Sequence, residues 1–238
     1  MQSVRITTVF DNTSLNSNCT PEWGFAAVIE LPHETILFDT GNDGQILQDN
    51  LKALGFAQTK FSKIIISHMH WDHTGGLSRM LQLNTDAHIF LPASATKHDF
   101  NIKKDNVTFV KEPQLLGKHI YSLGEMPARA NEQAIAIQTA QGLVIVTGCA
   151  HPGIVNIVRT ARQQFPEEEL LLVLGGFHLG QHSKDQVLEI IAELELGVKK
   201  VSPTHCTGAE AIGLFEQKFG EDFIKPGVGL SLEFPLSK

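Results

Sequence analysis

The residue types best suited to metal binding are concentrated in one short segment of the chain. His68, His70, Asp72 and His73 lie within six residues of one another, directly after an apolar run. In an extended segment, residues two apart share a face, so His68 and His70 can converge on one ion. Asp72 and His73 follow at the turn, where they can reach a second ion. Imidazole and carboxylate are ligands that zinc accepts at about 2.0–2.2 Å, so the spacing predicts a metal site.

Three further histidines follow apolar runs elsewhere in the chain, namely His151, His178 and His205. Rigid strands position the loops at their carboxyl ends, and functional side chains collect there. A lone histidine in such a place is more often a separately satisfied surface or core residue. Four strand ends that each run into histidine favour a shared site.

Periodicity predicts the elements that would position these side chains. Alternating or continuous apolar runs rich in β-branched residues indicate strands, and three-to-four spacing indicates helices. We expect strands at 4–10, 25–31, 35–38, 63–67, 87–91, 107–110, 134–139, 143–147, 170–174, 199–202 and 231–234, and helices at 44–54, 75–83, 154–164, 184–196 and 209–219.

The two halves of the chain resemble each other in outline. Residues 31–41 and 135–148 both read as hairpins that end in an apolar strand and a glycine, and a helix and a strand running into histidine follow each. Two β-rich halves with helices predict a mixed α/β (α+β) fold, a four-layer αββα sandwich, in one domain over residues 1–238.

Composition narrows the partners and the compartment. The net charge is -7, with no marked cluster of lysine and arginine, so bulk binding to nucleic acid is not expected. No apolar run approaches the roughly 18 residues that span a bilayer, and the first residues lack a signal-peptide pattern. Three scattered cysteines fit a reducing compartment. We expect a cytoplasmic protein without membrane contact.

The histidine-rich segment resembles the HxHxDH signature of the metallo-β-lactamase superfamily. A closer resemblance is to a subfamily of metal-dependent hydrolases related to an archaeal dihydropterin–ribofuranosylaminobenzene phosphate synthase. The landmarks that carry both resemblances are His68-Met69-His70-Trp71-Asp72-His73, Leu37-Phe38-Asp39-Thr40-Gly41, Glu22-Trp23-Gly24-Phe25, Gly148-Cys149-Ala150-His151-Pro152-Gly153-Ile154-Val155-Asn156, Gly175-Gly176-Phe177-His178-Leu179 and His205-Cys206-Thr207-Gly208.

The resemblance implies two divalent metal ions, zinc on this ligand set. It assigns His68, His70 and His151 to one ion, and Asp72, His73 and His205 to the other. The superfamily's usual bridging aspartate has no obvious counterpart, because the strand end where it belongs carries Gly175-Gly176-Phe177-His178. Two ions held by one carboxylate and neutral imidazoles keep more positive charge, which favours a small anionic, phosphate-bearing substrate.

For four other residues, a role in the site and a purely structural role are both open. Asp39 is expected to orient a ligand histidine by hydrogen bond, or to form a turn. Cys149 is expected to face the site from outside the ligand set, or to be a small buried hydrophobe. Trp71 and Phe177 are expected to wall a substrate pocket for a flat ring, or to pack in the core.

The leading hypothesis for function is metal-assisted hydrolysis. A water between the ions would lose its proton near neutral pH and attack a phosphoester or another anionic ester-like group. Asp72 would orient this nucleophile, and His178 would bind substrate and assist the leaving group. The alternatives are transfer from a pterin-methyl diphosphate, as in the related synthase, and a non-catalytic member of the fold that binds a metabolite.

Overall fold

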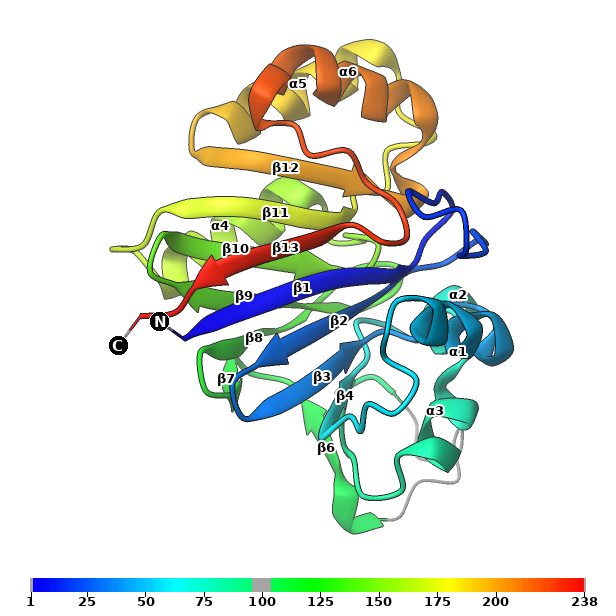
Figure 1. Cartoon of the computed structure of the whole chain (residues 1–238). Helices are drawn as coiled ribbons and strands as arrows, with labels where there is room; N and C mark the ends of the chain where they lie inside the picture. Colours follow the sequence, from blue (N-terminus) through cyan, green and yellow to red (C-terminus); the bar gives the residue numbers. More distant parts are fainter. Residues whose placement is uncertain (1, 96–103, 238) are drawn as a thin grey trace.

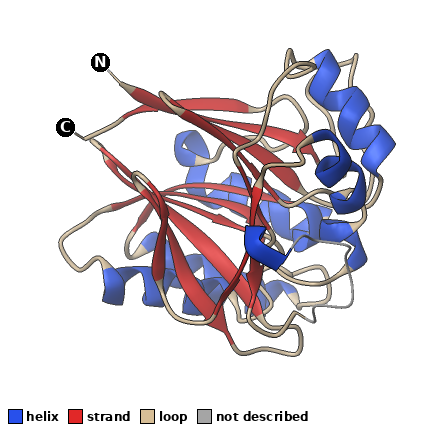
Figure 2. Cartoon of the chain, turned by 90° about the horizontal axis from the view of Figure 1, so that it is seen from below, coloured by secondary structure: helices blue, strands red, loops and turns tan. Residues whose placement is uncertain are grey.

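The computed structural model describes residues 2–95 and 104–237 and consists of two β-sheets with helices on their outer faces (Figures 1 and 2). The seven-stranded sheet has the order β13-β1-β2-β3-β4-β5-β6, and the six-stranded sheet has the order β12-β11-β10-β9-β8-β7. The predicted αββα architecture is therefore confirmed.

The first sheet comes from the N-terminal half and the last strand. Its strands are β1 (Ser3–Phe10), β2 (Ala26–Leu31), β3 (Glu34–Phe38), β4 (Lys63–Ile65), β5 (His88–Pro92), β6 (Val107–Val110) and β13 (Ser231–Pro235). Helices α1 (Gly44–Ala53), α2 (Trp71–Thr74) and α3 (Leu77–Leu83) belong to this half.

The second sheet comes from the C-terminal half. Its strands are β7 (Gln114–Gly117), β8 (Ile120–Met126), β9 (Glu132–Thr139), β10 (Gly142–Thr147), β11 (Leu170–Gly176) and β12 (Val198–Thr204). Helices α4 (Ile154–Gln164), α5 (Lys184–Glu195) and α6 (Ala209–Phe219) cover it. A capping box at Ser183 begins α5, since Ser183 accepts from the backbone of Gln186 and the Gln186 side chain accepts from the backbone of Ser183.

Strand alternation separates the hydrophobic core into three layers. Along β10, Val144 and Val146 pack in the cluster between the two sheets. Leu143 and Ile145 point to the other face of the sheet and pack with α4, α5 and α6. A third cluster lies between the first sheet and helices α1 and α3. Because successive strand residues face opposite sides, a continuous apolar run such as β10 is expected where both faces are buried.

Parallel pairing brings several strand ends to one edge of the sandwich. Strand β3 is parallel to β4, and β10 and β12 are both parallel to β11. The carboxyl ends of these five strands therefore meet at the edge opposite the two termini (Figure 1). This is the edge that carries the histidines.

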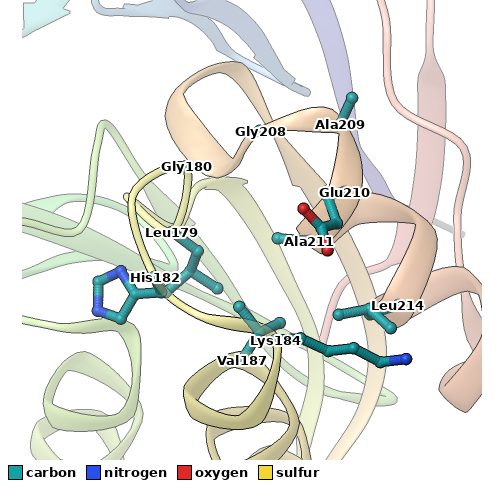
Figure 3. A pocket seen from close by; sticks show the side chains of 10 residues that line it. All are labelled: Leu179, Gly180, His182, Lys184, Val187, Gly208, Ala209, Glu210, Ala211 and Leu214. Carbon is teal, nitrogen blue, oxygen red and sulfur yellow. The ribbon is translucent and has the colours of Figure 1, made fainter.

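Two smaller features complete the description. A pocket of about 80 Å³, lined by His182, Lys184 and Glu210 among others, lies between the first turns of α5 and α6 (Figure 3); none of the six predicted metal ligands lines it. Among the described residues, no helix is long and apolar enough to cross a membrane.

Candidate metal centre

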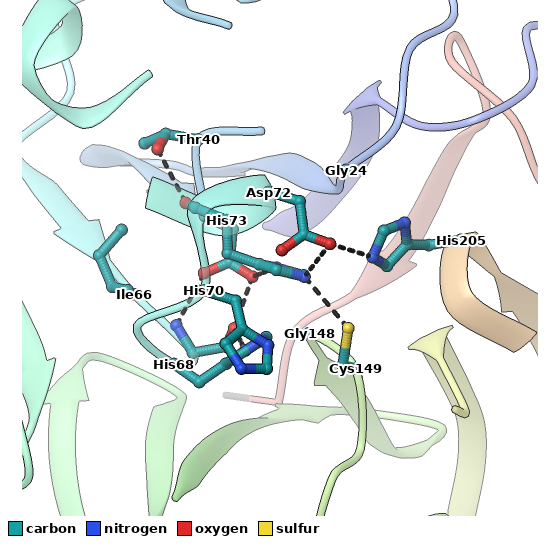
Figure 4. A network of polar contacts seen from close by, with 12 residues as sticks. Gly24, Thr40, Ile66, His68, His70, Asp72, His73, Gly148, Cys149 and His205 are labelled. Carbon is teal, nitrogen blue, oxygen red and sulfur yellow. Dashed lines mark hydrogen bonds and ion pairs between the residues drawn. The ribbon is translucent and has the colours of Figure 1, made fainter. Parts of the chain in front are cut away.

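The six predicted metal ligands, which the sequence scatters over 138 positions from 68 to 205, lie together at the edge of the sandwich. Part of the cluster is visible in Figure 4. His151 and His205 follow β10 and β12 of the second sheet, and the remaining ligands follow β4 of the first. The site therefore bridges the two sheets.

One group of ligands consists of three imidazoles in mutual contact. The ring centroids of His68 and His70 are 4.7 Å apart, those of His68 and His151 are 4.5 Å apart, and those of His70 and His151 are 4.8 Å apart. His68 is fully buried, whereas His70 is exposed at the rim. Three imidazoles around one point suit a single divalent ion with an open position.

The second group consists of Asp72, His73 and His205. Asp72 Oδ2 lies 3.3 Å from His205 Nε2 and 3.9 Å from His73 Nε2 (Figure 4). Two donors of one tetrahedral zinc ion are separated by about 3.3 Å at the usual bond lengths of zinc. The spacing of this group therefore fits one ion.

Asp39 orients two of the imidazoles. Its buried carboxylate accepts a hydrogen bond from His73 Nδ1 at 2.7 Å, and its Oδ2 accepts another from the Ser67 hydroxyl at 2.7 Å. The Ser67 hydroxyl is also 2.9 Å from His68 Nδ1. Burial raises the pKa of Asp39 to about 7, although the charge of His68 and the hydrogen bonds from Ser67 lower it in part. Contacts at both Nδ1 atoms leave both Nε2 atoms directed into the site.

Glu132 holds His151 in the same way, although no sequence pattern pointed to this residue. This fully buried carboxylate accepts hydrogen bonds at 2.9 Å from both the backbone N–H and Nδ1 of His151. Its other oxygen accepts from the Thr147 hydroxyl and from the backbone N–H groups of residues 148–150. Burial raises the pKa of Glu132, but the charge of His68 and the hydrogen bonds from His151 lower it further, so the pKa lies below the usual range.

Asn12 and Trp23 are also new members of the site. Asn12 Oδ1 lies 3.0 Å from His205 Nδ1, and Asn12 Nδ2 donates to the His205 carbonyl at 3.1 Å. Trp23 Nε1 donates to Asp72 Oδ2 at 2.8 Å, and its ring centroid is 4.9 Å from that of His205. Trp23 could have been predicted as a site residue, because it belongs to a motif that carries the family resemblance. No sequence pattern pointed to Asn12.

The protonation states fit metal binding. Burial, followed by the charge of a neighbouring histidine, lowers the pKa of both His68 and His73 to about 3. Burial would also lower the pKa of His205, but its contact with Asp72 raises it. His68 Nε2 is buried without a hydrogen-bond partner. Buried polar atoms are rarely left unpaired, so the donor set fits divalent ions.

The other predicted site residues have different surroundings. His178 lies beside His151, with ring centroids 4.6 Å apart, and is exposed. The Trp71 side chain is 62% exposed at the start of α2, and its contact with substrate stays a prediction. Of the two expectations for Phe177, packing in the core agrees with the structure and a place in the wall of a pocket does not. Phe177 is 1% exposed and packs edge to face on Phe215 of α6, because successive residues after β11 face opposite sides and His178 takes the outer side.

Comparison with known proteins agrees with this geometry. The sequence profile of the metallo-β-lactamase superfamily matches residues 20–111. The 7,8-dihydropterin-6-methyl-4-(β-D-ribofuranosyl)-aminobenzene-5′-phosphate synthase of Methanocaldococcus jannaschii is 30% identical, over 94% of this chain and 94% of the synthase. An uncharacterised protein of the same archaeon is 26% identical, over 82% of this chain and 87% of its own length.

A solved structure is similar over the same extent. The crystal structure of Tm1679, a metal-dependent hydrolase of the β-lactamase superfamily, aligns with a TM-score of 0.79 at 28% identity and covers 96% of this chain and 98% of that protein. The chain belongs to the metallo-β-lactamase superfamily. The resemblance drawn from the sequence is thereby confirmed.

Proposed function

We propose that this protein is an enzyme that uses two divalent ions, zinc on the present ligand set, to hydrolyse a phosphoester or similar bond of a small anionic molecule. The observation that supports it most is the convergence of His68, His70 and His151 beside Asp72, His73 and His205. The free cysteines favour the reducing environment of the cytoplasm as the location.

In this proposal, one ion is held by His68, His70 and His151 and the other by Asp72, His73 and His205. When bound, the ions supply Lewis acidity and lower the pKa of a water molecule so that it can act as a nucleophile near neutral pH. Asp39, Glu132 and Asn12 hold ligand imidazoles from behind, so these rings need no reorganisation when substrate arrives.

Two side chains are placed to act on the substrate. Asp72 keeps one carboxylate oxygen engaged by Trp23 and His205, so the other can accept a hydrogen bond from the attacking water. His178 is an exposed imidazole beside His151 that is outside the six candidate ligands. From there it can donate a hydrogen bond to an anionic substrate or to the leaving oxygen.

A transferase is the second candidate, because the 30% identical relative named above is a synthase. In that case the enzyme would attach a dihydropterin-methyl group to an aminobenzene ribofuranosyl phosphate, and diphosphate would leave. Mass spectrometry of the products distinguishes the two functions. A product in which water has been added to the pterin-methyl diphosphate supports hydrolysis, and a product with a new carbon–nitrogen bond supports transfer.

The test compares wild type with His68→Ala and with His33→Ala, an exposed histidine outside the site. Elemental analysis should give about two ions per chain for wild type and His33→Ala, with loss of metal and of phosphoester hydrolysis in His68→Ala. A phosphate ester should also inhibit better than a neutral lactone. Full activity in metal-free His68→Ala protein would overturn the proposal.

A further inference from the structure

The sulfur atom of Cys149 lies between the two groups of candidate ligands. We infer that Cys149 is itself a metal ligand, shared by both ions in place of a bridging carboxylate. This inference rests on the proposed two-metal site and adds a member to it.

Distances support a ligand position for the thiol. Cys149 Sγ is 3.2 Å from His73 Nε2 (Figure 4), where about 3.5 Å is expected between sulfur and nitrogen ligands of one tetrahedral zinc ion. Sγ also lies within 4.8 Å of the ligand atoms of Asp72 and His205. These four donors form one compact set.

The same sulfur belongs to the other group. Cys149 Sγ and the ligand nitrogens of His68 and His151 also lie within 4.8 Å of one another. A donor atom that is common to two ligand sets is in the position of a bridge. Cys206 differs, because its sulfur groups with Cys149 and His178 and with none of the six other candidate ligands.

The end of β11 explains why no carboxylate takes this place. A Cβ atom at Gly176 would lie 2.6 Å from the Gly148 carbonyl oxygen and 2.7 Å from Cys206 Sγ. Contacts this short do not occur, so residue 176 must stay a glycine while the strands pack this closely. The close approach brings the segment after β10, with Cys149, into the space that a side chain from β11 would otherwise use.

The backbone fixes the thiol in this position. The N–H groups of Gly148, Cys149 and Ala150 all donate to one oxygen of Glu132 at 2.9–3.0 Å. Ala150 has a left-handed backbone with φ 57°, which turns the chain sharply toward His151. The Cys149 side chain is 3% exposed yet faces polar donors, so it is not placed as a simple apolar residue.

The chemistry of a thiol suits this role. Zinc binds the thiolate, so each thiol that binds releases one proton to solvent, and no electron is transferred. The negative charge of the thiolate supplements that of Asp72 and reduces the excess positive charge that the missing aspartate would leave. A sulfur ligand also favours zinc or cobalt over magnesium and calcium.

The test uses cobalt(II) in place of the native metal and compares wild type with Cys149→Ser, Cys149→Ala and the matched control Cys206→Ser. Wild type and Cys206→Ser should show thiolate-to-cobalt charge-transfer absorption in the near ultraviolet and bind two ions. Both Cys149 variants should lose this absorption and bind the weaker ion at least about tenfold less tightly. Metal should also protect Cys149 of the wild type from alkylation.

The outcomes separate the two proposals. Two cobalt ions without thiolate absorption in wild type, or unchanged absorption in the Cys149 variants, overturn the role of Cys149 and leave the two-metal site intact. Less than one ion per wild-type chain overturns the proposed function and this inference with it. The spectra of wild type and Cys206→Ser together decide the matter even if a Cys149 variant fails to fold.

Discussion

Replacement of Glu132 by glutamine tests whether this carboxylate positions His151. The two oxygens of Glu132 together accept six hydrogen bonds, four of them from consecutive backbone N–H groups. A glutamine of nearly the same shape has one acceptor oxygen, and its second terminal atom carries two hydrogens. The substitution therefore changes acceptor capacity and charge with little change in volume.

The structure gives the expected size of the effect. With its NH₂ group toward His151, the glutamine leaves the His151 N–H unpaired and forces Nδ1 to accept a hydrogen bond. The ring proton then moves to Nε2, the atom needed for a metal. In the opposite orientation, the Thr147 hydroxyl and three backbone N–H groups lose their acceptor. One unpaired buried donor costs roughly 1–3 kcal/mol. The remaining hydrogen bonds also become weaker because their acceptor is no longer charged, so we expect the substitution to lower the free energy of unfolding by about 2–4 kcal/mol.

Chemical denaturation of the metal-free protein measures this cost, and competition with a chelator measures metal affinity. We expect Glu132→Gln to bind the weaker ion about 10–100-fold less tightly than wild type. Glu216→Gln, at an exposed position on α6, should change neither quantity. Thr147→Val removes one donor and leaves five, so it should cost about 1 kcal/mol and keep metal affinity. Wild-type stability and metal affinity in Glu132→Gln would refute the reasoning.

Three further perturbations test other contacts. Phe177→Ala should cost about 3–5 kcal/mol in denaturation experiments because a buried ring is removed from the core, while Trp71→Ala should stay within about 0.5 kcal/mol; equal costs would contradict the packing described. Gly148→Ala would place a Cβ 2.1 Å from the Ser67 hydroxyl, so a loss of about 1–3 kcal/mol is expected, and unchanged stability would show that Ser67 moves freely. Burial, and then Lys63, lowers the pKa of His88, so the unfolded chain binds more protons below pH 6.5 and stability is lost as the pH falls from there. His88→Gln should make this fall shallower, and an unchanged slope would exclude His88 as a cause.

Much of the fold was predictable because burial on both faces leaves long apolar runs. Each of the eleven strands expected from periodicity corresponds to a strand of the structure. Strands β7 and β8 were missed, and both pair irregularly: β7 with β8 shifts register between Leu115 and Gly117, and β8 with β9 between Ser122 and Glu125. The expected helix 75–83 begins at Leu77, because α2 ends at Thr74 and a separate helix follows. Short and irregular elements depend on tertiary contacts that local patterns do not report.

The candidate ligands were predictable because histidine after an apolar strand is an uncommon combination of residue types. The residues that orient them were harder to find, since Glu132 and Asn12 acquire meaning only through partners far along the chain. Glu132 lay just outside the expected strand 134–139, whereas β9 begins at Glu132 itself. Glu132 stands at the start of a buried strand. Its role becomes clear only when the pairing of β9 with β10 is known, because that pairing places it beside the residues that follow β10.

Backbone strain at the strand ends links the fold to the site. Asp39, Ala150, His178 and His205 have φ between 49° and 57°, a left-handed conformation that costs a non-glycine residue roughly 1–2 kcal/mol. Each follows a different strand, and the sharp turn points a side chain inward or reverses the chain beside a ligand. Such strain persists only where surrounding contacts fix the backbone, and at Ala150 the fixing contact is the buried carboxylate of Glu132. The folding free energy of the two sheets thus holds the donors in place, and little of the binding energy of an ion is needed to assemble them.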